Sequence, residues 1–335
     1  MTTHEGGPSE RDPAFREGRP VSSDQRGRTP PRRRLFAVLL GALAVSRLAG
    51  CAPALRTPVD ASSAGAPWQQ RLRGDTIALL GEVHDNAALH RLRAEALYRA
   101  VEDGWRPALV MEQFDIDRQD DLERGRRTHP NDARALITAA GAARGWDWAF
   151  YEPLVALALA HDLPLVAGNL SRSAAARVMR EGAAAVLGEA RARRLGLLEA
   201  VDPALLAAQE REIDLGHCGA LPPAMLPVMA RAQFARDAVM ADVLREHASG
   251  GAVLLAGDGH VRRDLGVPRW LDGVAPARLL CVGFVETGQP ALAGRYDALV
   301  VAAPASRDDP CRDFVPPRAV ALASTPAAPV IEPGR

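Results

Sequence analysis

The sequence predicts an α/β fold in which a mostly parallel sheet is flanked by helices and carries an inserted helical cap. Short apolar runs alternate with amphipathic stretches, and each run has the continuous hydrophobicity of a strand buried on both faces. A block rich in Ala, Arg and Leu extends over residues 171–248 without such a run. Because strands that alternate with helices favour a parallel sheet, we expect this helical block to be an insertion at the edge of the sheet.

The individual elements follow from these patterns in chain order. The expected strands cover residues 76–83, 108–111, 163–167, 252–256, 278–285 and 299–302. The expected helices cover 87–102, parts of the charged region up to 142, 146–161, several segments within 173–214, and 224–247. Asp85 or Asn86 is placed to cap the first of these helices, because a short polar side chain there accepts hydrogen bonds from free N–H groups.

The first 50 residues are expected to form a disordered extension and a lipoprotein signal peptide. Residues 1–31 are rich in Arg, Pro, Gly and Ser and contain little apolar content. The apolar stretch 35–45 follows three arginines and is too short for a bilayer, which requires about 20 residues. The next residues, Leu-Ala-Gly-Cys at 48–51, resemble the lipobox of bacterial lipoproteins. This resemblance implies cleavage before Cys51 and acylation of that cysteine, which would hold the protein on a membrane.

The resemblance to a lipobox also implies a place in the cell envelope. Ala52, rather than Asp, follows the cysteine, which favours the outer membrane, facing the periplasm. A secretory signal that contains a cysteine by chance is the alternative. After the signal we expect a tether over residues 51–74, an α/β domain over 75–305 and a loose tail rich in Pro and Ala over 306–335.

Charge and cysteine content limit the functions of the mature chain. The formal net charge is +0, from 41 basic and 41 acidic residues, and no basic stripe with interleaved aromatic residues occurs, so nucleic acid is not an expected partner. Besides Cys51, the chain contains Cys218, Cys281 and Cys311. Cys281 lies in an apolar strand pattern and is expected in the core. One disulfide is compatible with this number, and at least one thiol would then remain free.

Polar side chains follow most of the expected strands. They are Glu82 and His84, then Glu112, then Asn169 and Arg172, and finally Asp258 and His260. Because parallel strands bring their carboxyl ends to one edge of a sheet, these groups are expected to converge on a shared site. Two carboxylates and two imidazoles suit either proton transfer or a divalent metal ion.

Several segments together resemble the ChaN-like haem-binding lipoprotein family. They are GEVHDN at 81–86, MEQF at 111–114, WDWAFYEPL at 146–154, AGNLSR at 167–172, HCG at 217–219, AQFARDAVMA at 232–241 and LLAGDGHVRRDLGVPRWL at 254–271. The family is distantly similar to erythromycin esterases and to the TraB/Tiki protease-like group. The resemblance implies a role in iron or haem uptake, with haem as the ligand and a homodimer as the assembly.

A haem site requires side chains that can bind iron and others that line an apolar slot. Tyr151, His217 and Cys218 are the first candidates for the iron ligand, and His84 and His260 are further ones. Met229, Gln233, Arg236 and Met240 share one helical face and could line the slot, with Glu82 and Glu112 as partners of the two polar residues. The alternatives are a packed core tyrosine, a loop flanked by glycines and a methionine stripe in the core. Arg262, Arg263 and Arg269 could meet the propionates, although we expect at least one of them to be solvated.

Three functions remain open from the sequence. The first is a membrane-anchored haem-binding lipoprotein in iron or haem handling. The second is an esterase-like hydrolase in which His84 activates water and His260 or Arg172 stabilises an oxyanion. The third is a metal-dependent peptidase of the Tiki type. A serine hydrolase with a nucleophile elbow is not expected, since no G-x-S-x-G motif occurs.

Overall fold

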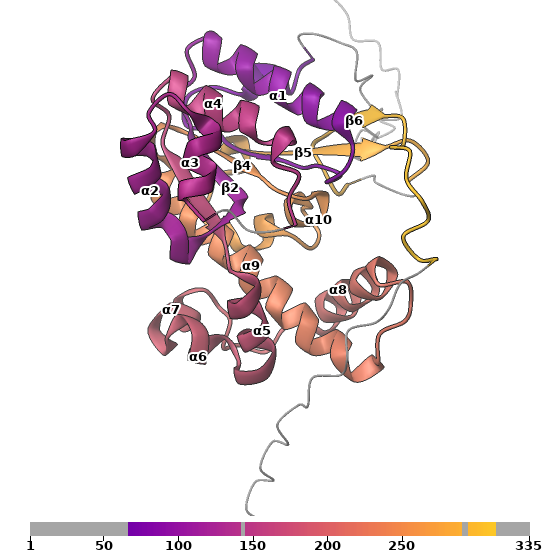
Figure 1. Cartoon of the computed structure of the whole chain (residues 1–335). Helices are drawn as coiled ribbons and strands as arrows, with labels where there is room; N and C mark the ends of the chain where they lie inside the picture. Colours follow the sequence, from indigo (N-terminus) through magenta and orange to yellow (C-terminus); the bar gives the residue numbers. More distant parts are fainter. Residues whose placement is uncertain (1–65, 142–144, 290–293, 313–335) are drawn as a thin grey trace, which may run out of the picture. The chain divides into compact units, whose positions relative to one another are not determined.

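In the part of the chain that it describes, the computed structural model of this protein contains a sheet of six parallel strands flanked by helices, in agreement with the mostly parallel sheet predicted from the sequence (Figure 1). The structure describes residues 66–141, 145–289 and 294–312. The predicted signal peptide, Cys51 and most of the predicted tether lie outside these residues. The strand order is β3-β2-β4-β1-β5-β6. The strands are β1 (Ile77–Leu80), β2 (Ala108–Asp115), β3 (Leu165–Asn169), β4 (Ala252–Leu255), β5 (Leu279–Glu286) and β6 (Ala298–Ala302).

The register of the central strands brings their carboxyl ends to one level. Leu80 of β1 and Met111 of β2 both pair with Leu255 of β4. Every residue of β1 and β4 is buried, because helices cover both faces of the sheet and no position along these strands meets water. Side chains that follow these three residues therefore emerge together beyond the last hydrogen-bonded pairs.

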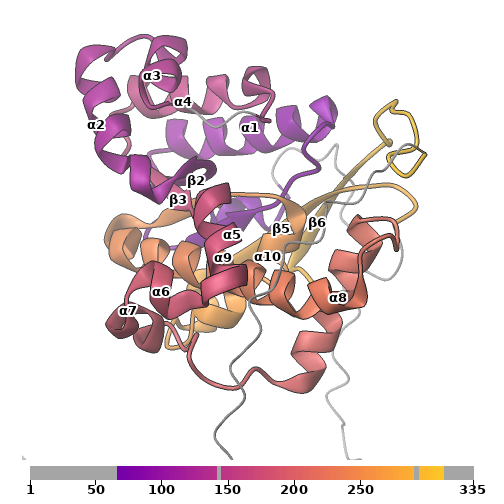
Figure 2. The ribbon, with the colours of Figure 1, turned by 60° about the horizontal axis from the view of Figure 1, so that its bottom comes forward.

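One face of the sheet is covered by a group of helices (Figure 2). They are α1 (Ala87–Glu102), α2 (Gln119–Thr128), α3 (Ala133–Ala139) and α4 (Glu152–Ala160). Asn86 is the cap of α1, and its side chain accepts hydrogen bonds from the N–H groups of Ala88 and Leu89. The buried face of α1 packs in one cluster with side chains from β1, β2, β4 and β5.

The opposite face is covered by α9 (Leu226–His247) and by the short helix α10 (Asp258–Val261) (Figure 2). Met240 and Leu244 of α9 pack on Ile77 of β1 and Val110 of β2 in a second core cluster. Cys281 is buried in this cluster, as predicted, and its thiol is free. The carboxyl-terminal half of α9 is therefore part of the layer that covers the sheet.

The predicted helical block 171–248 is present, but only part of it lies beyond the sheet. It consists of α5 (Arg172–Glu181), α6 (Ala183–Leu187), α7 (Glu189–Arg194), α8 (Pro203–Gly216) and α9. We call α5 to α8, together with the first half of α9, the cap. None of the helices in the described ranges is long and apolar enough to cross a membrane.

Two segments that were expected outside the α/β domain make contacts with it. Residues 66–74 were expected in the tether, yet Trp68 and Leu72 are buried, and Trp68 packs edge-on against Phe284. Residues 306–312 were expected in a loose tail, yet Arg307 forms ion pairs and Cys311 forms a disulfide with Cys218. The composition of these two segments did not predict the contacts, because the residues that they contact are distant in the sequence.

Candidate functional site

The strand-end residues converge where the chain changes from one face of the sheet to the other. β1 continues into α1 on one face, whereas β4 continues into α10 on the other face, and β1 and β4 are neighbours. Such a switch point leaves a crevice beyond the carboxyl ends, where ligands bind in open α/β sheets. Glu82 follows β1, Glu112 lies in the last half of β2, and Gly257 follows β4.

The first pair of functional groups is Glu82 and His84. The Glu82 side chain is only 1% exposed, whereas the His84 side chain is 55% exposed. His84 Nδ1 donates a hydrogen bond to Glu82 Oε1 at 2.8 Å. This bond favours the tautomer with its proton on Nδ1 and leaves Nε2 as the nitrogen that can meet a ligand.

Three buried residues form hydrogen bonds or ion pairs with Glu82 and His84. The guanidinium of Arg93, which is fully buried, forms an ion pair with Glu82 Oε2 and donates to His90 Nδ1 at 3.1 Å. His90 Nε2 in turn donates to the backbone carbonyl of His84 at 3.1 Å. The Tyr151 hydroxyl donates to Glu82 Oε1 at 2.5 Å. Buried residues thus fix both the side chain of His84, through Glu82, and its backbone, through His90.

The charges of this group follow from burial and from these contacts. Burial would raise the pKa of Glu82, but Arg93 and the neighbouring imidazoles outweigh it and lower that pKa. Burial and the charge of Arg93 lower the pKa of His90 to about 4, so His90 is neutral and can accept the hydrogen bond. Burial would lower the pKa of His84, but the hydrogen bond to Glu82 and the nearby Glu112 raise it. Burial and Glu82 raise the pKa of Tyr151, which remains a phenol.

The second pair is Glu112 and His260, and a third residue, Asp237 of α9, completes it. His260 Nδ1 donates to Asp237 Oδ1 at 2.5 Å, and Nε2 lies 3.3 Å from Glu112 Oε1. Glu112 Oε2 accepts a hydrogen bond from the N–H of Gly257 at 2.8 Å. Gln233 Nε2 lies within 3.2 Å of both ring nitrogens of His260. All of these side chains except Gln233 are buried.

The two carboxylates keep His260 charged. Burial would lower the pKa of His260, but Glu112 and Asp237 raise it to about 10. Burial would raise the pKa of Glu112, but His260 lowers it to about 2. Burial raises the pKa of Asp237 to about 6, although His260 opposes this effect. At neutral pH the group is therefore an imidazolium between two carboxylates.

The two pairs are neighbours across Gly257. A methyl group on Gly257 would lie 2.9 Å from Cε1 and 3.1 Å from Nε2 of His84, and 3.8 Å from Oε2 of Glu112. The close approach of His84 to the backbone therefore requires glycine here. The structure thus brings Glu82, His84, Glu112 and His260 together at one edge, as the strand-end pattern predicts.

An aromatic group adjoins the exposed imidazole. The rings of His84 and Trp146 pack edge to face with centroids 4.9 Å apart, and Trp146 packs in the same way on Tyr151 at 5.7 Å. Phe150 stacks on His90 with centroids 4.5 Å apart. Trp146, Trp148 and Phe150 are all half-buried. The segment 146–151 therefore places partly exposed apolar surface directly beside an exposed nitrogen ligand.

The four residues of α9 that were predicted to line a cofactor slot have different surroundings in the structure. Met240 is fully buried in the core, so its placement in a ligand slot was wrong, whereas Met229 is half-buried. Gln233 meets His260, and Arg236 Nη1 donates to Asn169 at 3.2 Å. Their partners are thus strand-end residues, but not the carboxylates that the sequence indicated.

Other candidates lie apart from the two pairs. Arg172 is exposed at the start of α5, and within the described ranges no hydrogen bond or ion pair joins it to a strand-end carboxylate or imidazole. Arg262 is buried and pairs with Asp264 and Glu212, and Arg263 pairs with Asp297. Of these three arginines after His260, only Arg269 is exposed.

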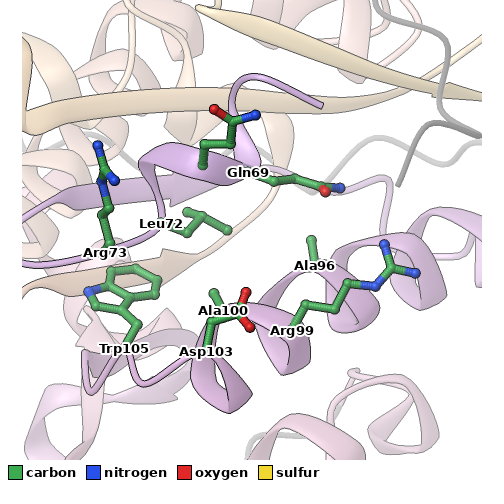
Figure 3. Close-up of a pocket in the computed structure, with 9 residues that line it drawn as sticks. Gln69, Leu72, Arg73, Ala96, Arg99, Ala100, Asp103 and Trp105 are labelled. Atoms are coloured by element: carbon green, nitrogen blue, oxygen red, sulfur yellow. The ribbon is translucent and has the colours of Figure 1, made fainter. Parts of the chain in front are cut away.

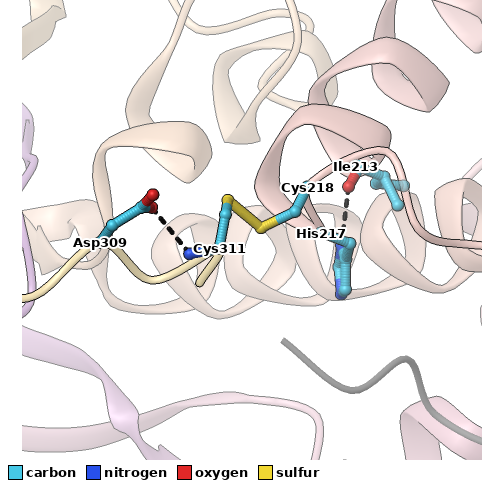
Figure 4. The surroundings of a disulfide bond; sticks show 5 residues. All are labelled: Ile213, His217, Cys218, Asp309 and Cys311. Atoms are coloured by element: carbon cyan, nitrogen blue, oxygen red, sulfur yellow. Dashed lines mark hydrogen bonds between the residues drawn. A yellow bond between two sulfur atoms is a disulfide. The ribbon is translucent and has the colours of Figure 1, made fainter. Parts of the chain in front are cut away.

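The loop that contains His217 and Cys218 connects α8 to α9. Cys218 is bonded to Cys311 and has no thiolate for iron in this form, so its prediction as an iron ligand does not hold for the oxidised protein (Figure 4). His217 is half-buried, and its Nδ1 donates to the carbonyl of Ile213 at 2.7 Å. The pairing of these cysteines was not deducible from their spacing.

Two further observations concern alternative sites. A groove of about 430 Å³ lies between residues 69–73 and the end of α1 (Figure 3), and its walls include Arg73, Arg99 and Trp105. Those residues adjoin the amino ends of β1 and β2, so this groove is separate from the strand-end site. Within the described ranges, no three His, Cys, Asp or Glu side chains are arranged to hold a metal ion.

Asp237, His90 and Arg93 were not predicted from the sequence. All three lie on helices, and their approach to the strand ends depends on packing between elements. The sequence does contain one sign of such residues, namely polar side chains on the apolar face of a helix. On α1, His90 and Arg93 share the buried face with Leu89, Ala96 and Leu97. Buried polar groups of this kind need partners.

Comparison with known proteins gives one family and a shared fold. A family model described as haem-binding uptake, Tiki superfamily, ChaN matches residues 68–271. The solved structure of ChaN from Campylobacter jejuni with cofacial haem is similar with a TM-score of 0.54 and 22% identity, over 68% of this chain and 88% of that one. No curated protein matches.

Two other solved structures resemble the chain more weakly. A protein from Bacillus cereus has a TM-score of 0.35 and 11% identity, over 69% of this chain and 71% of that one. An erythromycin esterase variant has a TM-score of 0.36 and 9% identity, over 66% of this chain and 75% of that one. At these scores the two structures carry no argument about the site.

Proposed function

The chain belongs to the ChaN family of haem-binding uptake proteins in the Tiki superfamily, and on that premise we propose that it binds haem with His84 as an iron ligand. The observation that carries this proposal is an imidazole that is more than half exposed while its other nitrogen is hydrogen-bonded to a buried carboxylate. Histidines that bind metals commonly have this arrangement, because a carboxylate on the second nitrogen fixes the ring and raises its basicity.

The surroundings of His84 suit a large, flat, apolar ligand. Haem supplies an iron ion that accepts a nitrogen ligand and a macrocycle that packs on apolar side chains. Trp146 lies against His84, and Trp148 and Phe150 are half-buried nearby. Within the described ranges no hydrogen bond is made by His84 Nε2. The residues present therefore fit this ligand in both respects.

Two of the first three candidates for the iron ligand, Tyr151 and Cys218, are less suitable in this form of the protein. Tyr151 is fully buried, and its hydroxyl donates to Glu82, so it supports His84 instead of meeting a ligand. Cys218 is in a disulfide. His217 remains a second ligand to test.

A haemin titration of the purified protein tests this proposal. The wild type should show a saturable Soret band at micromolar haemin, and His84→Gln should shift or abolish that band without changing the far-UV circular dichroism. Tyr151→Phe should weaken haemin binding without moving the Soret band. The matched control is His161→Gln, because His161 pairs with Glu102 at the end of α1 that is distant from His84. A wild type without saturable binding would show that haem is not its ligand, and an unchanged band in His84→Gln would exclude His84.

We further propose that the protein acts in iron or haem handling in the cell envelope. The lipobox-like sequence that ends at Cys51 supports an acyl anchor, and the outer membrane facing the periplasm is the proposed location. A homodimer that forms with haem is part of this proposal, and light scattering of the acyl-free protein with and without haemin tests it. A mass that stays that of one chain at saturating haemin would exclude the dimer.

The geometry also favours a second function, hydrolysis of an ester or amide. The observation for it is the pair of adjacent carboxylate–imidazole units: His84 is exposed, and the pKa of His260 is raised to about 10, so that its imidazole is charged at neutral pH. His84 could accept a proton from water, while the His260 imidazolium stabilises negative charge nearby. Activity on generic esters and peptides, with and without a chelator, tests this function. Loss of turnover in His84→Gln supports it, chelator sensitivity supports the Tiki-type alternative, and no turnover in any condition excludes both.

A further inference from the structure

Residues 303–311, which we call the strap, connect the end of β6 to the cap (Figure 1). The strap is fixed at its start by hydrogen bonds to two residues of the domain. Asn86 Nδ2 donates to the carbonyl of Ala303 at 2.9 Å, and the N–H of Ala305 donates to Glu286 Oε1 at 2.9 Å. Glu286 is the last residue of β5, so this end of the strap is held at the carboxyl edge of the sheet.

The middle of the strap touches the turn that presents His84. Arg307 donates to Glu286 at 2.5 Å and 3.0 Å, and its Nε lies 2.7 Å from Asp85 Oδ2. Asp85 directly follows His84. The strap is thus connected to the edge of the candidate site through the guanidinium of Arg307 and, at its start, through Asn86.

The far end of the strap is bonded covalently to the cap. Cys311 forms a disulfide with Cys218, in the turn between α8 and α9 (Figure 4). The two cysteines are 93 residues apart, so the bond closes a long loop that spans β4, β5 and β6. Asp309 Oδ1 accepts a hydrogen bond from the N–H of Cys311 and orders the residues before it.

α8 packs along α9. Its described ion pairs with the sheet side involve Glu212, which lies 2.8 Å from the buried Arg262 and 3.9 Å from Arg295. None of these contacts includes the strap. Among the described residues, the disulfide is therefore the link between this end of the cap and the strap.

We propose that the Cys218–Cys311 disulfide is a redox-controlled latch that fixes the cap and the strap beside the His84 site and so slows exchange of the bound ligand. Cys311 is exposed and Cys218 is half-buried, so a dithiol reductant can reach the bond. One dithiol gives two electrons and two protons, becomes a disulfide itself, and leaves two thiols on the protein. Of the contacts described for the strap, those with Glu286, Asn86 and Asp85 then remain, and the turn after α8 loses its covalent bond to the strap. The identity of the ligand rests on the proposed haem function, whereas the latch itself does not.

A cysteine variant tests the latch without a reductant that could react with haem. Cys311→Ser and Cys218→Ser are compared with the wild type by amide hydrogen exchange of the full chain. Exchange in α8 and in the strap should be faster by about tenfold or more in both variants, as expected for loss of a local restraint, whereas exchange in α4 should not change. Cys281→Ser, which removes the buried free thiol, is the matched control.

Ligand exchange gives the second readout. The rate at which haemin passes to an excess of apomyoglobin should rise at least about fivefold in Cys311→Ser and should stay at the wild-type value in Cys281→Ser. Unchanged amide exchange in α8 and the strap would overturn the latch, and an unchanged haemin rate would overturn its control of the site. If the wild type binds no haemin, the haem function fails, and amide exchange alone decides whether the latch exists.

Discussion

Replacement of Arg93 by methionine should both destabilise the protein and reverse the pH dependence that Glu82 contributes. Arg93 is fully buried and forms an ion pair with Glu82, which is 2% exposed. Methionine fills much of the same volume without charge, so the carboxylate loses its counter-charge. Removal of one partner of a buried ion pair costs about 3–5 kcal/mol. Such a loss is a large share of the stability of a typical domain.

The sign of the pH effect follows from the pKa of Glu82. In the wild type that pKa is below its ordinary value, because Arg93 and the imidazoles outweigh burial. The pair therefore contributes stability above the ordinary pKa of a glutamate, and this contribution is lost as the pH falls through the lowered pKa. Without Arg93, burial dominates and raises the pKa of Glu82 above its ordinary value. Stability is then lost as the pH rises, so the deficit of the variant is larger at pH 7.5 than at pH 5.0.

Urea unfolding at these two pH values measures the effect. Glu82→Gln in the Arg93→Met background removes the unpaired charge and should recover about half of the loss at pH 7.5 or more, since replacement of both members of a buried pair is often nearly neutral. Arg263→Met, which breaks a half-buried pair with Asp297 far from Glu82, is the control. An equal deficit at both pH values, with no recovery in the double variant, would refute the reasoning about the charge of Glu82.

Three further predictions address other parts of the chain. Gly257→Ala should weaken haemin binding by about tenfold or more, equal to about 1.4 kcal/mol, because the added methyl group displaces the exposed imidazole of His84. Gly259→Ala is the control and should bind haemin as the wild type does, since no atom lies within 4 Å of its new methyl group. Equal haemin affinities of the two variants would contradict the prediction. Asp237→Asn should lower the pKa of His260 from about 10, as followed by NMR titration of the ring; a pKa that does not move would show that Asp237 does not sustain the charge. Cys51→Ser should abolish acylation, and acyl chains on the variant in mass spectrometry would disprove the anchor.

The sheet was predictable because β1 to β5 are buried on both faces. The run Ile77–Leu80 is apolar at every position, so its type was clear, although the strand is shorter than the predicted range 76–83. Boundaries were less certain, as at β3, which begins at Leu165 instead of residue 163. Pro164 has no N–H for the sheet, and its carbonyl instead accepts a hydrogen bond from Leu109 at the edge of the ladder.

The strand-end half of the site was predictable from topology, and the helical half was not. A parallel sheet alone requires that Glu82 and Glu112 emerge at the same edge. No such rule connects Asp237 to His260, since their approach depends on how α9 crosses the sheet. For the same reason the sequence pointed to the wrong partners for Gln233, and the disulfide of Cys218 could not be assigned.

The position of β1 in the middle of the sheet has a consequence for the order in which the protein can mature. His84 leaves the ribosome early, yet β1 pairs with β4 and β5, which are synthesised about half a chain later. Contacts of such long sequence separation form slowly, because a long loop must close first. The early part of the chain therefore has a central strand without neighbours, and this strand is an open edge that invites aggregation. A chain interrupted before β4 would contain Glu82, His84 and Glu112 and still have no site.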